Sequence, residues 1–323
     1  MHKPLCSVSL DLDNLWSYLK THGDAGWDEY PSYLDIVVPR VLGFLKGRGH
    51  RITWFIVGKD AAEPKHHPVL RSLVTAGHEV ANHSFHHEPW LHLYSEAEID
   101  AELAKTEDAI EQATGARPNM FRGPGFSHSP TLFNVLARRG YRFDASTFPT
   151  FLGPLARLYY FAMAKGLSAE EREKRKKLFG KLSDGFGRLK PYFWHTPSGP
   201  LLEIPVTTMP LFKLPIHLSY LLYLGNFSPL LAKAYWQVAL LMCRTFGVEI
   251  SLLLHPLDFM GCDDTTRLNF FPAMKQPHGP KLKLAHELFA MLEKRYELVP
   301  MSRHAEAIEA RLATRTLATA TKA

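Results

Sequence analysis

Short apolar segments alternate with amphipathic segments along the first 150 residues of the chain. The short apolar segments, which predict β-strands, are residues 5–13, 51–58, 79–84, 118–124 and 141–147. The segments with apolar positions three or four residues apart, which predict helices, are residues 33–49, 67–78, 95–115 and 129–140. Repeated strand and helix units are typical of parallel strands, so the pattern predicts an α/β fold whose sheet is closed or doubly wound.

Polar stretches, whose side chains could take part in catalysis or metal binding, follow the predicted strands. These stretches are SLDLDN (9–14), NHSFHH (82–87), FRGPGF (121–126) and FDAST (143–147). In barrels built from strand and helix units, the chemistry lies on loops at the carboxyl ends of the strands. The four stretches are therefore expected to meet at one end of the sheet.

The regular alternation stops near residue 150. A charged run at 168–182 is interpreted as a solvent-facing helix, and strands return at 201–210 and 249–259, followed by a last amphipathic helix at 278–296. We therefore expect one domain over residues 1–310, with a helical, amphipathic insertion within 151–248. The remaining residues, 311–323, are expected to form a flexible tail.

Composition limits the class of protein. The chain has 323 residues, of which 46% are hydrophobic and 22% are charged, as expected for a protein with one sizeable core. Three scattered cysteines do not form a disulfide framework, the first residues lack the pattern of a secretory signal, and the apolar stretch 218–243 is interrupted by polar residues, glycine and proline. These features favour a location of the protein in the cytoplasm. The net charge of +6 comes without an aromatic and basic ladder for nucleic acid, but it suits a phosphate-bearing substrate or an anionic membrane surface.

One carboxylate and two imidazoles are a common hydrolytic zinc set. Asp13, His83 and His87 supply that set at predicted strand ends, so we expect them to bind one divalent metal ion, with zinc the first choice. Asp11 points to the same side of its strand as Asp13, and it either takes a proton from the attacking water or orders the ligands. A lone His is usually structural, and His86, between the ligands, is expected to face solvent or to contact a ligand.

The quoted motifs, together with SLLLHPLDF (251–259), resemble in order the five motifs of the NodB-like polysaccharide deacetylases, carbohydrate esterase family four. The resemblance implies a distorted seven-stranded (β/α) barrel and hydrolysis of an N-acyl group from an amino sugar. It also implies that Asp11 is the general base and that Asp13, His83 and His87 are the metal ligands.

The same resemblance assigns further roles. Arg122 would orient the base, and His255 would be the general acid that protonates the leaving amine, with Asp144 keeping it charged. The substrate pocket would be lined by Pro124, Gly125 and Phe126. Asp258 either contacts the substrate or caps the end of its strand.

Two departures from the commonest family pattern refine this reading. Leu12 separates the two acids of the first motif, which is similar to an Asp-x-Asp branch that includes deacylases of lipid-linked sugars and metal-independent relatives acting on purine breakdown products. The fourth motif has Phe148 where Trp is usual. An Asp-x-Asp enzyme without a secretion signal needs an intracellular substrate.

The insertion suggests what that substrate is. Residues 153–166 and 209–236 combine apolar and aromatic residues with cations, as do helices in a membrane interface. We expect a polyprenyl-phosphate amino sugar, deacetylated or deformylated at the inner face of the cytoplasmic membrane; the same helices also suit a lid or a dimer interface. Two other hypotheses stay open: a soluble amidohydrolase of a small cytosolic metabolite, with or without a metal, and a non-catalytic carbohydrate-binding module.

Overall fold

The computed structural model describes residues 3–155, 158 and 181–320. Its strands are β1 (Leu5–Leu12), β2 (Thr53–Ile56), β3 (Glu79–Asn82), β4 (Met120–Phe121), β5 (Phe143–Asp144), β6 (Tyr192–Thr196), β7 (Gly199–Glu203), β8 (Ile250–Leu254) and β9 (Glu297–Val299). Its longer helices are α1 (Leu15–His22), α2 (Leu34–Lys46), α4 (His67–Thr75), α5 (Glu96–Thr114), α6 (Pro130–Arg138), α9 (Leu218–Phe227), α10 (Pro229–Thr245), α11 (His278–Glu293) and α12 (Met301–Ala320), and α3 (Gly58–Ala61) is a single turn. The charged run 168–182, apart from its last two residues, and most of 153–166 lie outside the described residues.

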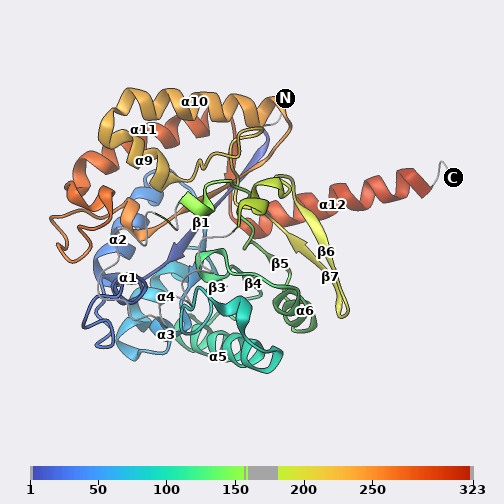
Figure 1. Ribbon diagram of the computed structural model, residues 1–323, viewed down its shortest axis with the longest axis horizontal. Helices are drawn as coiled ribbons and strands as arrows, with labels where there is room; N and C mark the ends of the chain where they lie inside the picture. Colours follow the sequence, from blue (N-terminus) through green and yellow to red (C-terminus); the bar gives the residue numbers. More distant parts are fainter. Residues whose placement is uncertain (1–2, 156–157, 159–180, 321–323) are drawn as a thin grey trace.

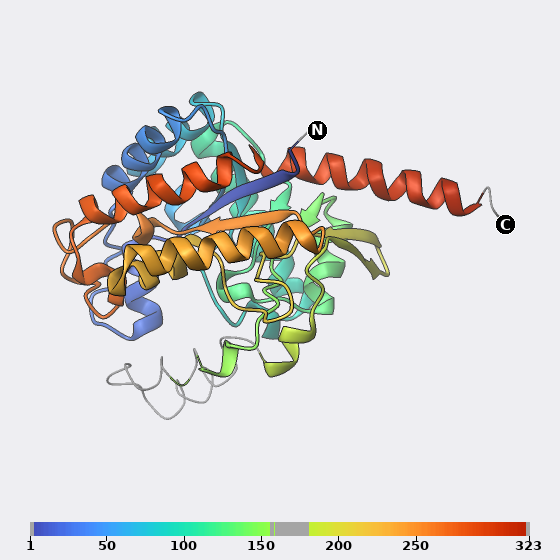
Figure 2. The same ribbon diagram turned by 90° about the horizontal axis from the view of Figure 1, so that it is seen from above.

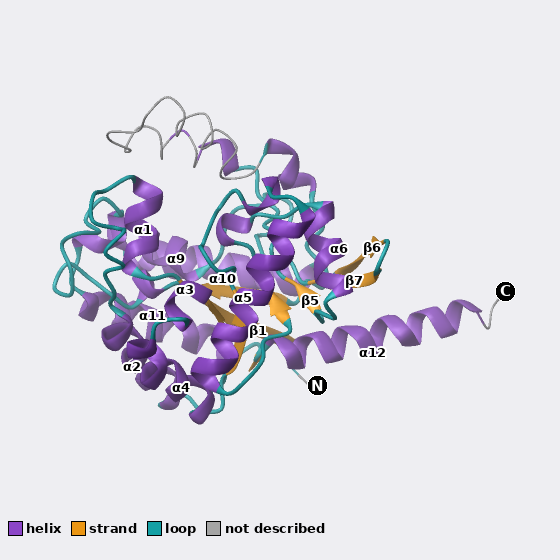
Figure 3. Ribbon diagram, turned by 90° about the horizontal axis from the view of Figure 1, so that it is seen from below, coloured by secondary structure: helices purple, strands orange, loops and turns teal. Residues whose placement is uncertain are grey.

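One sheet contains all of these strands, in the order β6-β7-β5-β4-β3-β2-β1-β8, and β9 pairs with the start of β1. Every pairing is parallel except that of β6 with β7. Helices surround most of the sheet, and the hairpin of β6 and β7 lies at its edge (Figure 3). This is the expected α/β architecture of strand and helix units, with β1 between β2 and β8 and seven of its eight residues buried.

The two ends of the parallel sheet approach each other. The backbone N–H of Thr207, just after β7, donates to the carbonyl oxygen of Ser251 in β8 (3.1 Å), and the Ser251 N–H donates to Thr207 Oγ1 (2.8 Å). Among the described residues no strand pairing joins β7 to β8, so these two bonds take the place of a ladder. The circuit from β7 through β5, β4, β3, β2 and β1 to β8 has the strand number of the expected distorted barrel.

The helices form two groups around the sheet. Helices α9, α10 and α11 lie together on one side, and α3, α4 and α5 lie on another (Figure 1). The largest apolar cluster joins β1 to both groups and contains Trp54 and Trp236. The Trp236 indole N–H donates to the Leu288 carbonyl (3.0 Å), which ties α10 to α11. None of the described helices combines the length and the apolar content that crossing a membrane requires.

Helix α12 covers the end of the sheet where the strands begin. Met301 and Ile308 pack with Phe55 and Phe143 in a separate apolar cluster, and the Met301 N–H donates to Thr53 Oγ1 (2.9 Å). The helix then projects from the body (Figure 2). Residues 311–320, which we expected to form a flexible tail, continue α12. The Arg311 guanidinium pairs with Glu249.

Most predicted elements are confirmed, with shifted ends. The capping box of Ser95 and Glu98 is present at the start of α5. The strand predicted at 201–210 is wrong in extent: β7 ends at Glu203, and it forms a hairpin with β6, which the sequence pattern did not indicate. The apolar stretch 218–243 is two helices, because Ser228 caps α10 and Pro229 cannot continue α9.

Candidate active site

The three predicted metal ligands lie together at the carboxyl ends of β1 and β3. Asp13 Oδ1 is 2.9 Å from His87 Nε2 and 3.3 Å from His83 Nε2. One donor atom from each side chain lies within 4.8 Å of the others, and all three residues are buried. The sequence therefore places three ligand-type groups in one small volume.

The backbone between the two imidazoles turns sharply. Ser84 (φ 59°) and His87 (φ 52°) have left-handed conformations, which cost free energy in residues other than glycine. Asn82 stabilises this turn, because its side-chain oxygen accepts the Ser84 N–H (2.8 Å). The turn allows side chains four residues apart to point at the same carboxylate.

A hydrogen bond to the backbone fixes the orientation of the His83 ring. His83 Nδ1 is 2.7 Å from the Arg122 carbonyl oxygen, which accepts its proton and turns Nε2 toward Asp13. Burial alone would raise the pKa of Asp13, but the charges and hydrogen bonds of His87 and His83 hold it well below its ordinary value. An anionic carboxylate and outward-facing imidazole nitrogens fit a divalent ion such as zinc.

Asp11 pairs with Arg122 beside the three ligands. Arg122 is fully buried and donates through Nη1 to Asp11 Oδ1 (2.7 Å) and Ser9 Oγ (3.0 Å), and through Nε to the Ala145 carbonyl (2.9 Å). A buried guanidinium needs such partners. The other carboxylate oxygen, Asp11 Oδ2, remains 4.0 Å from His83 Nε2, so it is directed to the ligand cluster.

His255 follows β8 and lies half-buried. Its Nδ1 is 3.1 Å from Ser219 Oγ on α9, and its backbone N–H donates to Asp258 Oδ2 (2.8 Å). Asp258 is only 1% exposed, which leaves it little surface for a substrate and favours the capping role that the sequence left open. Ser219 belongs to α9, and Asp258 belongs to the turn after β8.

Asp144 does not contact His255 in the described part of the chain. Phe143 and Ala145 lie in the cluster with α12, so Asp144 points to the opposite face of β5. Its carboxylate accepts from the Ser146 hydroxyl (2.6 Å) and N–H (3.0 Å), and it neighbours Glu203. Burial and the charge of Asp144 raise the pKa of Glu203 well above its ordinary value, as in a carboxyl pair that shares a proton.

An aromatic row runs from the loop after β4 to His255. The Phe126 ring stacks on Phe148 (4.6 Å between centroids), Phe148 is 5.8 Å from the His217 ring, and His217 is 5.6 Å from the His255 ring. Gly125 (φ 57°) lets the loop turn, while Pro124 is buried beneath it. Phe148, which replaces the expected Trp, thus lies in a row of rings that reaches the predicted acid.

Four residues of this region were not identified from the sequence: Tyr18, Glu203, His217 and Ser219. Burial and the charge of Asp13 raise the pKa of Tyr18 well above its ordinary value, and Asp258 acts in the same direction, so Tyr18 lies near both Asp13 and Asp258. Neither Ser219 nor His217 belongs to a recognisable motif. Only the packing of α9 against β8 brings them to His255.

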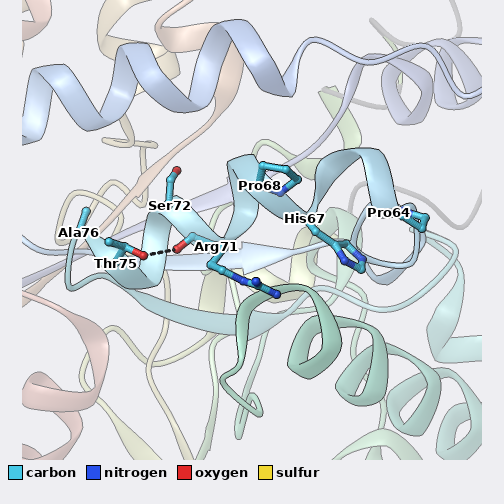
Figure 4. Close-up of a pocket in the computed structure, with 7 residues that line it drawn as sticks. All are labelled: Pro64, His67, Pro68, Arg71, Ser72, Thr75 and Ala76. Carbon is cyan, nitrogen blue, oxygen red and sulfur yellow. Dashed lines mark hydrogen bonds between the residues drawn. The ribbon is translucent and has the colours of Figure 1, made fainter.

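A surface hollow on the outer side of α4 is separate from this site. Its lining contains Pro64, His67, Pro68, Arg71, Ser72, Thr75 and Ala76 (Figure 4). None of the predicted site residues lines it, and the hydrogen bond drawn there, from the Thr75 hydroxyl to the Arg71 carbonyl, stays within the helix. The hollow therefore does not supply a competing site.

Comparison with known proteins agrees with the geometry. Residues 24–143 match the family described as "Polysaccharide deacetylase", a range that contains His83, His87 and Arg122. A peptidoglycan deacetylase of Helicobacter pylori is 26% identical over 149 residues, which are 44% of this chain and 49% of that protein. A peptidoglycan-N-acetylglucosamine deacetylase of Bacillus cereus is 29% identical over 86 residues, 27% of this chain and 30% of that protein. The chain thus spans half or less of the length of these relatives.

A crystal structure from Mycobacterium smegmatis, described as a polysaccharide deacetylase, has the same fold. It covers 96% of this chain and 92% of its own, with a TM-score of 0.63 and 21% identity. The ordered motifs, the α/β sheet and the family match agree with one another. Over residues 24–143 the chain therefore resembles the polysaccharide deacetylase family, and it has the fold of the Mycobacterium smegmatis structure.

Proposed function

We propose that the protein is a metal-dependent hydrolase that removes an N-acetyl or N-formyl group from an amino sugar. The observation that carries this proposal is the convergence of Asp13, His83 and His87 beside the Asp11 and Arg122 pair. A ligand set of this kind leaves coordination positions for water and for an acyl oxygen. A divalent ion bound there would acidify a water molecule and polarise the acyl carbonyl.

The side chains of the chain provide the proton transfers. Asp11 accepts a proton from the attacking water, and Arg122 holds Asp11 in place through the 2.7 Å bond. His255 then donates a proton to the departing nitrogen, since an amine leaves poorly without one. Phe126 and Phe148 offer ring surfaces to the sugar along one side.

We further propose that the sugar is carried on a polyprenyl phosphate at the inner face of the cytoplasmic membrane. The start of α9 lies at His255, and its end exposes Phe227 (69% exposed) next to Leu230 (74% exposed) on α10. Ten helical residues span about 15 Å, so one helix links the proposed acid to an apolar surface. Residues 209–236 contain two lysines and no acidic residue, which suits anionic headgroups.

Metal content is the first test, with His86 as a matched control. We expect about one zinc or similar ion per chain by elemental analysis, and loss of that ion when His83 and His87 are both replaced by alanine. His86→Ala should keep the metal, because the His86 ring contacts the Glu102 carboxylate and is not one of the three ligand-type groups. The same three proteins should then be assayed for acetate or formate release from N-acyl amino sugars.

The outcomes separate the competing functions. Metal retained by the double variant would contradict the ligand assignment. A wild-type protein that takes up no zinc but still hydrolyses small amides would favour the metal-independent amidohydrolase. Binding of sugars without acyl release, with the metal present, would favour a carbohydrate-binding module.

A further inference from the structure

Helix α9 delivers a hydroxyl group to the proposed general acid. Ser219 lies in the first turn of α9, and its Oγ is 3.1 Å from His255 Nδ1. The same hydroxyl is a hydrogen-bond partner of the Asp258 carboxylate. Asp258 in turn accepts the backbone N–H of His255 (2.8 Å), so the three residues form a closed set of contacts.

The chemistry of these groups fixes the direction of each hydrogen bond. Burial raises the pKa of Asp258 above its ordinary value, while the charges of His255 and Lys281 and the Ser219 hydrogen bond oppose that rise. The ionised carboxylate only accepts, so the Ser219 hydroxyl donates its one proton to Asp258. A lone pair of Ser219 Oγ then accepts the proton on His255 Nδ1. The opposite ring nitrogen, Nε2, is left for the substrate.

We propose that Ser219 is a positioning residue for His255, linking its imidazole to Asp258 and holding Nε2 toward the leaving nitrogen. This inference rests on the proposed function. In the step it serves, the C–N bond breaks with its electron pair on nitrogen, the proton on His255 Nε2 passes to that nitrogen, and the imidazolium becomes neutral. Ser219 and Asp258 keep their protonation states throughout.

The surroundings support an assignment to His255 rather than to the neighbouring imidazole. His217 is 7% exposed, and its Nδ1 has no hydrogen-bond partner among the described residues. Burial and the nearby His255 lower the pKa of His217 well below its ordinary value, so His217 stays neutral. In the described part of the chain, the Lys281 ammonium from α11 and the Tyr18 phenol from α1 also face Asp258.

A helix-capping role does not account for Ser219. The residue preceding α9 is His217, whose side chain makes no capping hydrogen bond, and Ser219 lies two positions further along. A serine that caps a helix is available nearby for comparison: Ser228, at the start of α10, accepts the Leu231 N–H (3.4 Å). Ser228→Ala therefore removes the same hydroxyl from the same pair of helices without touching His255.

The test compares Ser219→Ala, Ser219→Thr and Ser228→Ala, all with metal content verified. Ser219→Ala should lower kcat for an N-acetyl amino sugar about tenfold, and the alkaline limb of its pH profile should move to lower pH. Hydrolysis of 4-nitrophenyl acetate should fall less than about twofold, because its leaving group needs no proton. Ser219→Thr should restore the amide rate, and Ser228→Ala should leave all three readouts unchanged.

A second measurement does not depend on activity. The 15N chemical shifts of the His255 ring report which nitrogen carries the proton, and Ser219→Ala should change the Nδ1 signal while Ser228→Ala does not. Unchanged Nδ1 shifts and an unchanged amide to ester ratio in Ser219→Ala would overturn the positioning role. Absence of acyl release by the wild-type protein would instead refute the proposed function, while the 15N shifts would still decide the contact.

Discussion

At the scale of single residues, Arg122 contacts both the proposed base, Asp11, and one proposed metal ligand, His83. Its side chain holds Asp11, and its backbone carbonyl fixes the ring of His83. Because Arg122 is fully buried, its charge must stay paired, and the geometry of both neighbours is therefore constrained. One residue after β4 thus aligns the proposed base with one of the proposed metal ligands.

Replacement of Asp11 by Asn should separate catalysis from metal binding. Asparagine keeps the shape of the side chain and can still meet Arg122, but it cannot accept a proton from water. We expect kcat to fall by about 10² to 10⁴. Metal content by elemental analysis should stay near the wild-type value, since the three ligand atoms come from Asp13, His83 and His87.

Ser9→Ala is a suitable control for this substitution. It removes another contact of Arg122 Nη1, at 3.0 Å, without touching the carboxylate, so it reports disturbance of the guanidinium alone. Full activity in Asp11→Asn would refute the base assignment. Loss of metal in Asp11→Asn would show that Asp11 belongs to the ligand set.

The sequence predicted the cluster of candidate ligands because its members follow parallel strands of a regular pattern. Asp13, His83 and His87 needed only the parallel order of β1, β2 and β3 to meet. The proposed partner of His255 could not be predicted in that way. The face to which Asp144 points follows from the packing of β5, and Ser219 reaches His255 only through the docking of α9.

At the scale of elements, the predicted helices and strands match the structure where apolar residues recur at a regular spacing along a segment. They do not match where contacts with distant parts of the chain determine the local structure. Strand β1 and helix α5 have clear patterns, and their predicted ends are close to the observed ones. Strands β4 and β5 have only two residues each, because loops carrying site residues replace regular pairing. The hairpin of β6 and β7 forms at the edge of the sheet, and its polar and aromatic sequence gave no clear signal of pairing.

Docking of α12 provides a pH-dependent prediction. Burial would raise the pKa of Glu249, but hydrogen bonds from His304 and Arg311 of α12 lower it from 4.5 to about 2. A carboxyl whose pKa is depressed in the folded protein stabilises it above the ordinary pKa. That stabilisation should be lost as the pH falls from about 4.5 toward about 2.

Thermal unfolding of Glu249→Gln measures this contribution. At neutral pH the variant should unfold about 2–4 °C below the wild type, a modest effect because the pair is partly exposed to solvent. The difference should shrink as the pH approaches 2, where Glu249 becomes protonated in both states. An equal difference at all pH values would mean that the charge of Glu249 does not stabilise the docked helix.

At the scale of the whole molecule, the two ends of the parallel strands differ: one end is covered by a helix and the other carries the proposed active site. Helix α12 packs where the strands begin, and the proposed active site lies where they end. The pair of helices α9 and α10 joins that site to an exposed apolar tip, formed by Tyr223, Phe227, Leu230 and Leu231. Because Ser228 and Pro229 fix the break between the two helices, the tip is a defined corner of the fold.

Placing acidic residues at this apolar tip tests the proposed membrane contact. Phe227→Glu combined with Leu230→Glu should weaken binding to vesicles of phosphatidylethanolamine and phosphatidylglycerol at least about tenfold, because two apolar side chains leave the interface and two negative charges approach anionic lipid. Vesicle sedimentation measures the change. Ile36→Glu, on an exposed apolar position of α2, is the matched control and should bind like the wild type.

Unchanged binding of the double variant would refute the membrane contact. Conversion of a dimer to a monomer, seen by light scattering, would instead assign the tip to an interface between two copies of the chain.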